Sequence, residues 1–184
     1  MNTFGKVIFS QGEYLGEVLN GKAHGYGRIN FNNGDKYIGQ WSNNCMSGIG
    51  FIDTKSYRTL GQFFNGKRHG NCLTIYKKGL TEFDFYIGKY ENDLKCGKGA
   101  YLWENEDCYY GDFANNRPNG KGFISRFGGD SFFGGTYKDS KCIDGGVDFS
   151  KTKLPSGCTF YGDCNKYDFY SGFGLLVSQH NKVR

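Results

Sequence analysis

Apolar and polar residues alternate along this chain in a unit that recurs about seven times, and each unit is centred on a glycine. These repeat glycines are Gly16, Gly39, Gly61, Gly88, Gly111, Gly135 and Gly162. Aromatic residues stand two positions before the glycine in every unit except the third, and two positions after it in most units, as with Tyr37 and Trp41 around Gly39. Because alternate residues of a strand share a face, the pattern predicts a β-strand whose rings and glycine point the same way.

A turn follows each of these strands. Four residues after the repeat glycine the sequence reads Asn20-Gly21, Asn43-Asn44, Asn65-Gly66, Asn92-Asp93 and Asn115-Asn116. Such pairs tolerate the positive φ angles that tight hairpin turns require. A second strand with two further glycines comes next, as at Gly25 and Gly27. The sequence therefore predicts consecutive β-hairpins.

The hairpins are expected to support one another, because a single two-stranded hairpin is only marginally stable in water. We expect each strand glycine to leave room for a ring from the neighbouring hairpin to lie flat across the backbone. Units start near residues 14, 37, 59, 86, 109, 133 and 160, and residues 1–13 look like a half repeat before them. The expected array covers residues 1–177, and residues 178–184 form a polar tail.

The first two units, with Tyr14-x-Gly16 and Tyr37-x-Gly39-x-Trp41 before a turn and a pair of glycines, resemble MORN repeats. The resemblance implies an all-β fold, an elongated single-layer twisted antiparallel sheet with a groove along one face. It also implies several roles, including cytoskeletal scaffolding, binding of phosphoinositides, dimerisation and capture of partner helices or peptides. Thr59, Cys72 and Cys164 depart from the repeat pattern.

Composition excludes few classes of function. The net charge of +5 is spread over mixed basic and acidic residues, which does not favour nucleic acid as a partner. The seven cysteines show no C-x-x-C pair, so neither a disulfide framework nor a zinc site is indicated. Without a signal peptide or a long apolar run, the expected location is the cytoplasm, at the cytoskeleton or a membrane surface.

Catalytic chemistry is not indicated. The sequence contains no G-x-S-x-G, H-E-x-x-H or P-loop motif, and His24 and His69 share one repeat position, which favours a structural role. The acidic residues Glu104, Glu106 and Asp107 lack the spacing of a calcium loop. We therefore expect no catalytic residues, no metal, no cofactor and no enzyme activity.

Two sets of residues are candidates for binding. The aromatic set is Tyr14, Phe31, Tyr37, Trp41, Phe63, Tyr76, Tyr90, Trp103, Phe113 and Tyr137. For any single ring, packing between repeats is the favoured interpretation and contact with a partner the alternative; the two are compatible, because contiguous exposed apolar surface often marks a binding site. The basic set is Lys22, Lys67, Arg117 and Lys141, which share one position near the hairpin tips.

Three functions compete at this point. The leading one is a non-enzymatic scaffold that binds a protein partner, an amphipathic peptide, a helix or a second copy, through the aromatic groove. The second is a peripheral binder of anionic phospholipid that uses the basic edge. The third is a regulatory subunit of an enzyme complex. A homodimer is also expected, because an open sheet leaves strand edges that another copy can cover.

Overall fold

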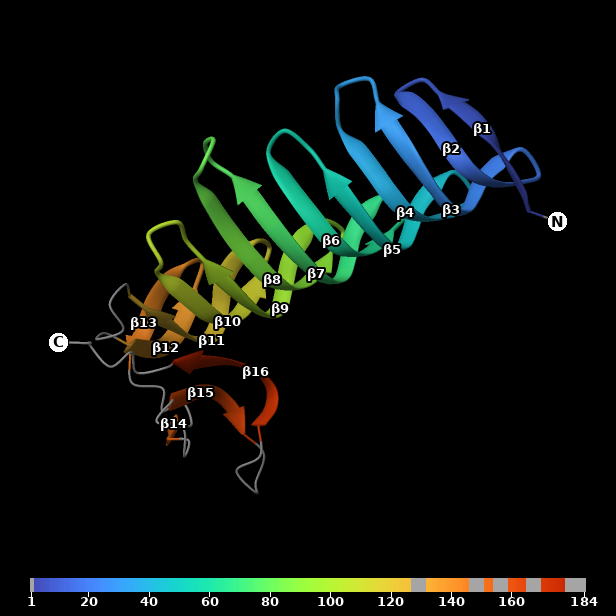
Figure 1. Ribbon diagram of the computed structural model, residues 1–184. Helices are drawn as coiled ribbons and strands as arrows, with labels where there is room; N and C mark the ends of the chain where they lie inside the picture. The colour runs from blue at the N-terminus through green and yellow to red at the C-terminus, as the bar shows by residue number, and fades with distance from the viewer. Residues whose placement is uncertain (1, 127–131, 146–150, 154–158, 165–169, 178–184) are drawn as a thin grey trace.

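The computed structural model describes residues 2–126, 132–145, 151–153, 159–164 and 170–177, with side-chain surroundings for 2–126 and 134–144. Thirteen strands form one open antiparallel sheet in chain order, extended along one direction (Figure 1). They are β1 (Thr3–Phe9), β2 (Gly12–Leu19), β3 (Lys22–Phe31), β4 (Lys36–Ser42), β5 (Cys45–Asp53), β6 (Tyr57–Phe64), β7 (Lys67–Lys77), β8 (Phe83–Glu91), β9 (Leu94–Leu102), β10 (Cys108–Ala114), β11 (Arg117–Ser125), β12 (Phe132–Lys138) and β13 (Lys141–Gly145). The predicted all-β architecture is confirmed.

Three further strands, β14 (Lys151–Lys153), β15 (Thr159–Cys164) and β16 (Tyr170–Val177), form a second antiparallel sheet. In it Gly162 pairs with Gly174, as the repeat glycines of the other hairpins pair with their second strands. The side chains of Phe133, Phe160 and Cys164 and the predicted tail 178–184 lie outside the described residues.

The hairpin turns have the geometry that the sequence predicted. Both residues of each turn have positive φ, for example 48° at Asn43 and 70° at Asn44. The turns also join neighbouring hairpins: the Asn44 N–H donates to the Ala23 carbonyl at 3.0 Å, and the Ala23 N–H donates to Asn44 Oδ1 at 2.8 Å. Successive hairpins are thus held in a fixed register at their tips.

A row of paired glycines crosses the entire sheet. Its members, one from each strand, are Gly5, Gly16, Gly27, Gly39, Gly50, Gly61, Cys72, Gly88, Gly99, Gly111, Gly122, Gly135 and Gly145. We call the side of the sheet to which a Cβ at these glycines would point the inner face. There, tyrosine rings cover the glycine pairs of the first, second, fourth and fifth hairpins. A Cβ added at Gly50 would overlap the ring of Tyr37.

The ring over each glycine pair comes from the same hairpin, which corrects the expectation that the neighbouring hairpin supplies it. Tyr37 on β4 lies over Gly39 and, diagonally across the strand pair, over Gly50 on β5. The diagonal neighbour is within reach of an aromatic side chain, and with no side chain at Gly50 the ring can lean onto it. The next hairpin instead contacts the tyrosine ring with an aromatic ring of its own.

A β-bulge after the repeat glycine provides the backbone carbonyl to which the tyrosine hydroxyl donates. The pairing register shifts between Gly39 and Trp41, and Tyr37 Oη donates to the carbonyl of the intervening Gln40 at 3.0 Å. The Gln40 side chain in turn accepts from the Ile49 N–H at 2.7 Å. The same tyrosine bond recurs in the first, fourth and fifth hairpins. The bulge thereby satisfies backbone groups that the ladder leaves unpaired.

Rings of the repeat columns pack edge to face between hairpins, which confirms the packing interpretation. Trp41 contacts Tyr14 of the preceding hairpin with ring centroids 4.9 Å apart, and Phe63 contacts Tyr37 at 5.2 Å. The Trp41 indole also donates to the Gly27 carbonyl at 3.2 Å. These contacts bury the inner face of a sheet that has no second layer among the described strands β1–β13.

The third hairpin keeps this arrangement with different residues. Thr59 replaces the tyrosine, and Cys72 replaces the facing glycine. A Cβ at Gly61 would lie 2.6 Å from Cys72 Sγ, the same distance that separates such an atom at Gly39 from Tyr37 Oη. The Cys72 thiol contacts the Gln62 carbonyl at 3.4 Å. One thiol therefore occupies the place, and takes over the hydrogen bond, of the missing tyrosine hydroxyl.

Candidate functional site

The aromatic candidates lie on the inner face, where the protein uses most of them itself. Exposed fractions are between 0 and 5% for Tyr14, Tyr37, Trp41, Phe63, Tyr90, Phe113 and Tyr137. The remaining three, Phe31, Tyr76 and Trp103, are half-buried at the margins of the same clusters. The structure therefore brings the set together in two ring clusters, and their contact with a partner stays a prediction.

The opposite face carries a row, apolar except for Arg28, that sequence reasoning missed. We call it the outer row; its residues are opposed in register across β2 to β11 and are Leu15, Arg28, Ile38, Phe51, Leu60, Leu73, Ile87, Ala100, Tyr110 and Phe123. Exposed fractions reach 58% at Ile38, 54% at Leu60 and 49% at Ile87, whereas Tyr110 and Phe123 at the end of the row are buried. The sequence signal was present, because the residue directly before the repeat glycine is apolar in each of the first five units.

The outer row is hollowed near its start and bordered by charges of both signs. A depression of about 360 Å³ is lined by Leu15, Tyr26 and Ile38, with glycine backbone between them. Along the border, Asp53 pairs with Lys77 at 2.6 Å and with Arg58 at 3.2 Å. The hydrogen bond from Lys77 holds the pKa of Asp53 below its usual value, so this carboxylate stays charged at neutral pH.

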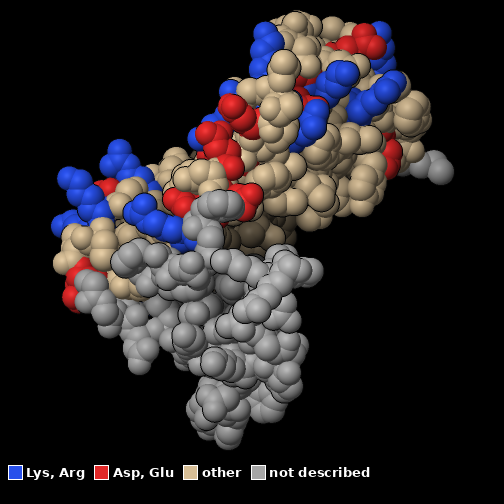
Figure 2. All heavy atoms as spheres, turned by 60° about the vertical axis from the view of Figure 1, so that its left-hand side comes forward, with Lys and Arg blue, Asp and Glu red and all other residues tan. Residues whose placement is uncertain are grey.

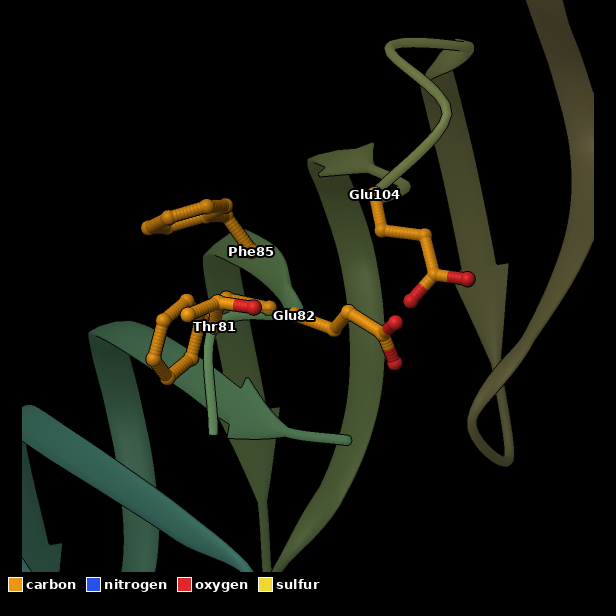
Figure 3. Close-up of a pocket in the computed structure, with 5 residues that line it drawn as sticks. Thr81, Glu82, Phe85 and Glu104 are labelled. Atoms are coloured by element: carbon orange, nitrogen blue, oxygen red, sulfur yellow. The ribbon is translucent and has the colours of Figure 1, made fainter. Parts of the chain in front are cut away.

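A second depression lies beside the loops that follow β7 and β9. It has a volume of about 400 Å³ and is lined by Thr81, Glu82, Phe83, Phe85 and Glu104. Figure 3 shows the Glu82 and Glu104 carboxylates directed toward each other, with the Phe85 ring on the other side. Two exposed carboxylates are too few to hold a cation tightly, and no group of three potential metal ligands occurs among the described residues.

The basic candidates share one exposed edge. Lys22, Lys67, Arg117 and Lys141 are each the first residue of a second hairpin strand, and all are exposed. Arg117 lies 4.0 Å from Asp139, with both side chains 63% exposed. Over the visible part of the described surface, basic side chains are interspersed with acidic ones (Figure 2). The edge is therefore positive only locally.

Burial makes Cys72 and Cys108 poor nucleophiles. Cys45, Cys72, Cys96, Cys108 and Cys142 are free, and burial raises the pKa of Cys108 to about 11 and also raises that of Cys72. A thiol with a raised pKa stays protonated and unreactive at neutral pH. Among the described elements, none is a helix long and apolar enough to cross a membrane.

Comparison with known proteins gives one family and a group of distant relatives. The model of the MORN repeat matches residues 14–36, 37–53, 60–81, 86–108 and 109–131, which together are more than half of the chain. Over 111 residues, 60% of this chain, the sequence is 28% identical to alsin of Mus musculus and 27% identical to alsin of Homo sapiens. The matched segment spans 6% of the mouse protein and 5% of the human one.

Proposed function

This chain belongs to the MORN-repeat family, an all-β interaction module, and from that premise we propose that it is a non-enzymatic scaffold whose outer row binds an amphipathic helix of a protein partner. The observation that carries the proposal is the exposed apolar part of the row, from Ile38 on β4 to Ile87 on β8, because contiguous apolar surface of this kind marks interaction sites. The inner face offers less free surface, since its rings are already buried against one another.

The shape and border of the outer row support a helical occupant. Neighbouring strands are about 4.8 Å apart, so the row presents an apolar position at nearly the repeat of a helix, about 5.4 Å per turn. An amphipathic helix carries an apolar stripe between polar flanks. Lys36, Asp53 and Arg58 lie beside the row and provide both signs of charge for such flanks.

A single charge placed in the outer row tests this function. We expect Leu60→Asp to weaken binding of the partner's helix at least tenfold, because a carboxylate would be buried in the interface without a counter-charge. Affinity capture identifies the partner, and fluorescence anisotropy with a labelled peptide of its helix measures the dissociation constant. Leu60 is 54% exposed in the free protein, so the substitution is expected to leave the fold intact.

Leu80→Asp is the matched control. Leu80 is fully exposed in the loop between β7 and β8, away from the outer row, so the same change there should leave the dissociation constant within about twofold of the wild-type value. If Leu60→Asp binds as well as Leu80→Asp, while Tyr76→Ala or Trp103→Ala weakens binding, the partner occupies the inner groove and the outer-row proposal fails.

The exposed basic edge supports a second candidate function, peripheral binding of anionic phospholipid. Each Lys or Arg near an anionic membrane adds about 1 kcal/mol, so the four residues together give weak attachment. We expect flotation with phosphatidylserine vesicles at low salt, its loss at high salt, and a clear reduction in the Lys22→Gln plus Lys67→Gln variant.

Lys36→Gln plus Lys55→Gln controls for net charge, because it removes two exposed lysines from other parts of the surface. Equal flotation of the two double variants, or flotation that persists at high salt, would contradict a specific role for the basic edge.

A further inference from the structure

The inner face buries two cations at equivalent positions of neighbouring hairpins. Arg68 and Lys95 each stand seven residues after the repeat glycine, at the start of β7 and β9. The Arg68 guanidinium lies over the rings of Tyr57 and Tyr90, 4.5 and 4.6 Å from their centroids. Its charge is balanced by Asp93 in the next turn, at 3.0 Å.

Lys95 is held by rings in the same way, but it lacks the counter-charge. Its Nζ lies 4.2 Å from the ring centroid of Tyr101, 4.8 Å from that of Tyr76 and 5.1 Å from that of Tyr86. The side chain is 9% exposed, and within the described part of the chain no carboxylate is within ion-pair distance of it. Cation–π contacts compensate only part of the cost of burying a charge.

The two cations differ in their counter-charge because one residue differs in the turn that follows each of them. Asp93 accepts from the Arg68 N–H at 3.0 Å, and Asn116 accepts from the Lys95 N–H at 2.9 Å. The two turn residues also have nearly the same backbone, with φ of 69° at Asp93 and 71° at Asn116. A neutral amide therefore stands where the preceding hairpin has a carboxylate.

An open cavity lies beside the unpaired lysine. It has a volume of about 210 Å³ and is lined by Lys95, Tyr101, Trp103, Phe113, Asn116 and Pro118. Most of its lining residues are aromatic or apolar, and Lys95 and Asn116 are its charged and amide-bearing members. A cavity of this size accommodates a single ring or side chain.

The groups around Lys95 only partly compensate the positive charge of its ammonium. Burial, with a smaller contribution from the positive charge of Arg68 on β7, lowers the pKa of Lys95 to about 8, while Asp84 on β8 acts in the opposite direction. The phenols of Tyr76 on β7, Tyr86 on β8 and Tyr101 on β9 are neutral, because burial raises the pKa of each. At pH 7 most of the lysine is still charged.

We propose that this cavity binds a carboxylate carried on a flat apolar group, with the carboxylate accepting from the Lys95 ammonium and the apolar group against Trp103 and Tyr101. The ligand supplies the negative charge that Asp93 supplies to Arg68 in the preceding hairpin. This site is separate from the outer row and does not depend on it. A free aryl carboxylate and a peptide that ends in phenylalanine share the required chemistry.

Titration of the full chain with phenylacetate tests the site, with 2-phenylethanol as the neutral probe of similar shape. Calorimetry measures affinity, and NMR of ¹³C-labelled lysine side chains follows the Lys95 pKa. We expect phenylacetate to bind at least tenfold more tightly than 2-phenylethanol and to raise the Lys95 pKa. An acetylated peptide ending in Phe, compared with its amide, distinguishes a peptide terminus from a small molecule as the source.

Two variants and one control variant keep the test decisive. Lys95→Met should lower the affinity for phenylacetate at least tenfold, whereas Lys67→Met, at an exposed lysine of the basic edge, should leave it unchanged. Asn116→Asp keeps Lys95 and supplies an internal carboxylate, so it should raise the Lys95 pKa and exclude the probe. If neither phenylacetate nor the peptide binds, or if both bind Asn116→Asp as tightly as the wild type, the proposal is overturned.

Discussion

Gly50→Ala is expected to lower the free energy of unfolding by about 3 kcal/mol, because the added methyl group has no space beneath the Tyr37 ring. The ring cannot move aside, since its hydroxyl is bonded to the Gln40 carbonyl and its edge contacts Trp41 and Phe63. Relief of the overlap would break the bulge and the packing between two hairpins at once. Urea denaturation followed by tryptophan fluorescence measures the loss.

Gly5→Ala is the matched control from the same glycine row. At Gly5 an added Cβ would meet only the Val18 side chain, with Cγ2 nearest at 3.4 Å, so the change in unfolding free energy should stay below about 1 kcal/mol. A Gly50→Ala protein as stable as Gly5→Ala would show that the ring above the glycine is free to shift, and that the glycine row is not needed for packing.

The second large effect is a coupling between Thr59 and Cys72. Thr59→Tyr alone is expected to cost about 3 kcal/mol, because the Cys72 sulfur already occupies the space over Gly61. Cys72→Gly alone should cost about 1–2 kcal/mol through the lost contact with the Gln62 carbonyl and the space left behind. The double variant restores the tyrosine and glycine of the other hairpins, so it should lie within about 1 kcal/mol of the wild type.

Denaturant unfolding of all four proteins gives the coupling energy directly. The Thr59 hydroxyl also shares a 2.9 Å hydrogen bond with Thr74, and its loss is common to Thr59→Tyr and the double variant, so it cancels from the cycle. If the two single effects simply add in the double variant, the thiol does not substitute for a tyrosine hydroxyl.

Most of the fold could be predicted from the sequence, whereas little of the candidate site could. The Asn43-Asn44 turn and the rings flanking Gly39 are local signals, because positive φ and a period of two act within one hairpin. The outer row was not predicted, because one apolar residue before a repeat glycine does not show which side chains of other strands it will meet. Ile38 and Leu60 are separate apolar positions in the sequence, and only their pairing through Phe51 makes them a continuous surface.

The sequence by itself determined that this chain is a series of hairpins, where each one turns, and which side chains of each strand share a face, because those properties depend on neighbouring residues and on backbone sterics. The tertiary structure alone decided that Tyr37 covers the glycines of its own hairpin, that one thiol replaces a hydroxyl in the third hairpin, and that Lys95 has no counter-charge among the residues described. Those outcomes depend on which groups from paired strands and from adjacent hairpins meet. Residues as far apart as Lys95 and Asn116 meet only when the register between hairpins is fixed.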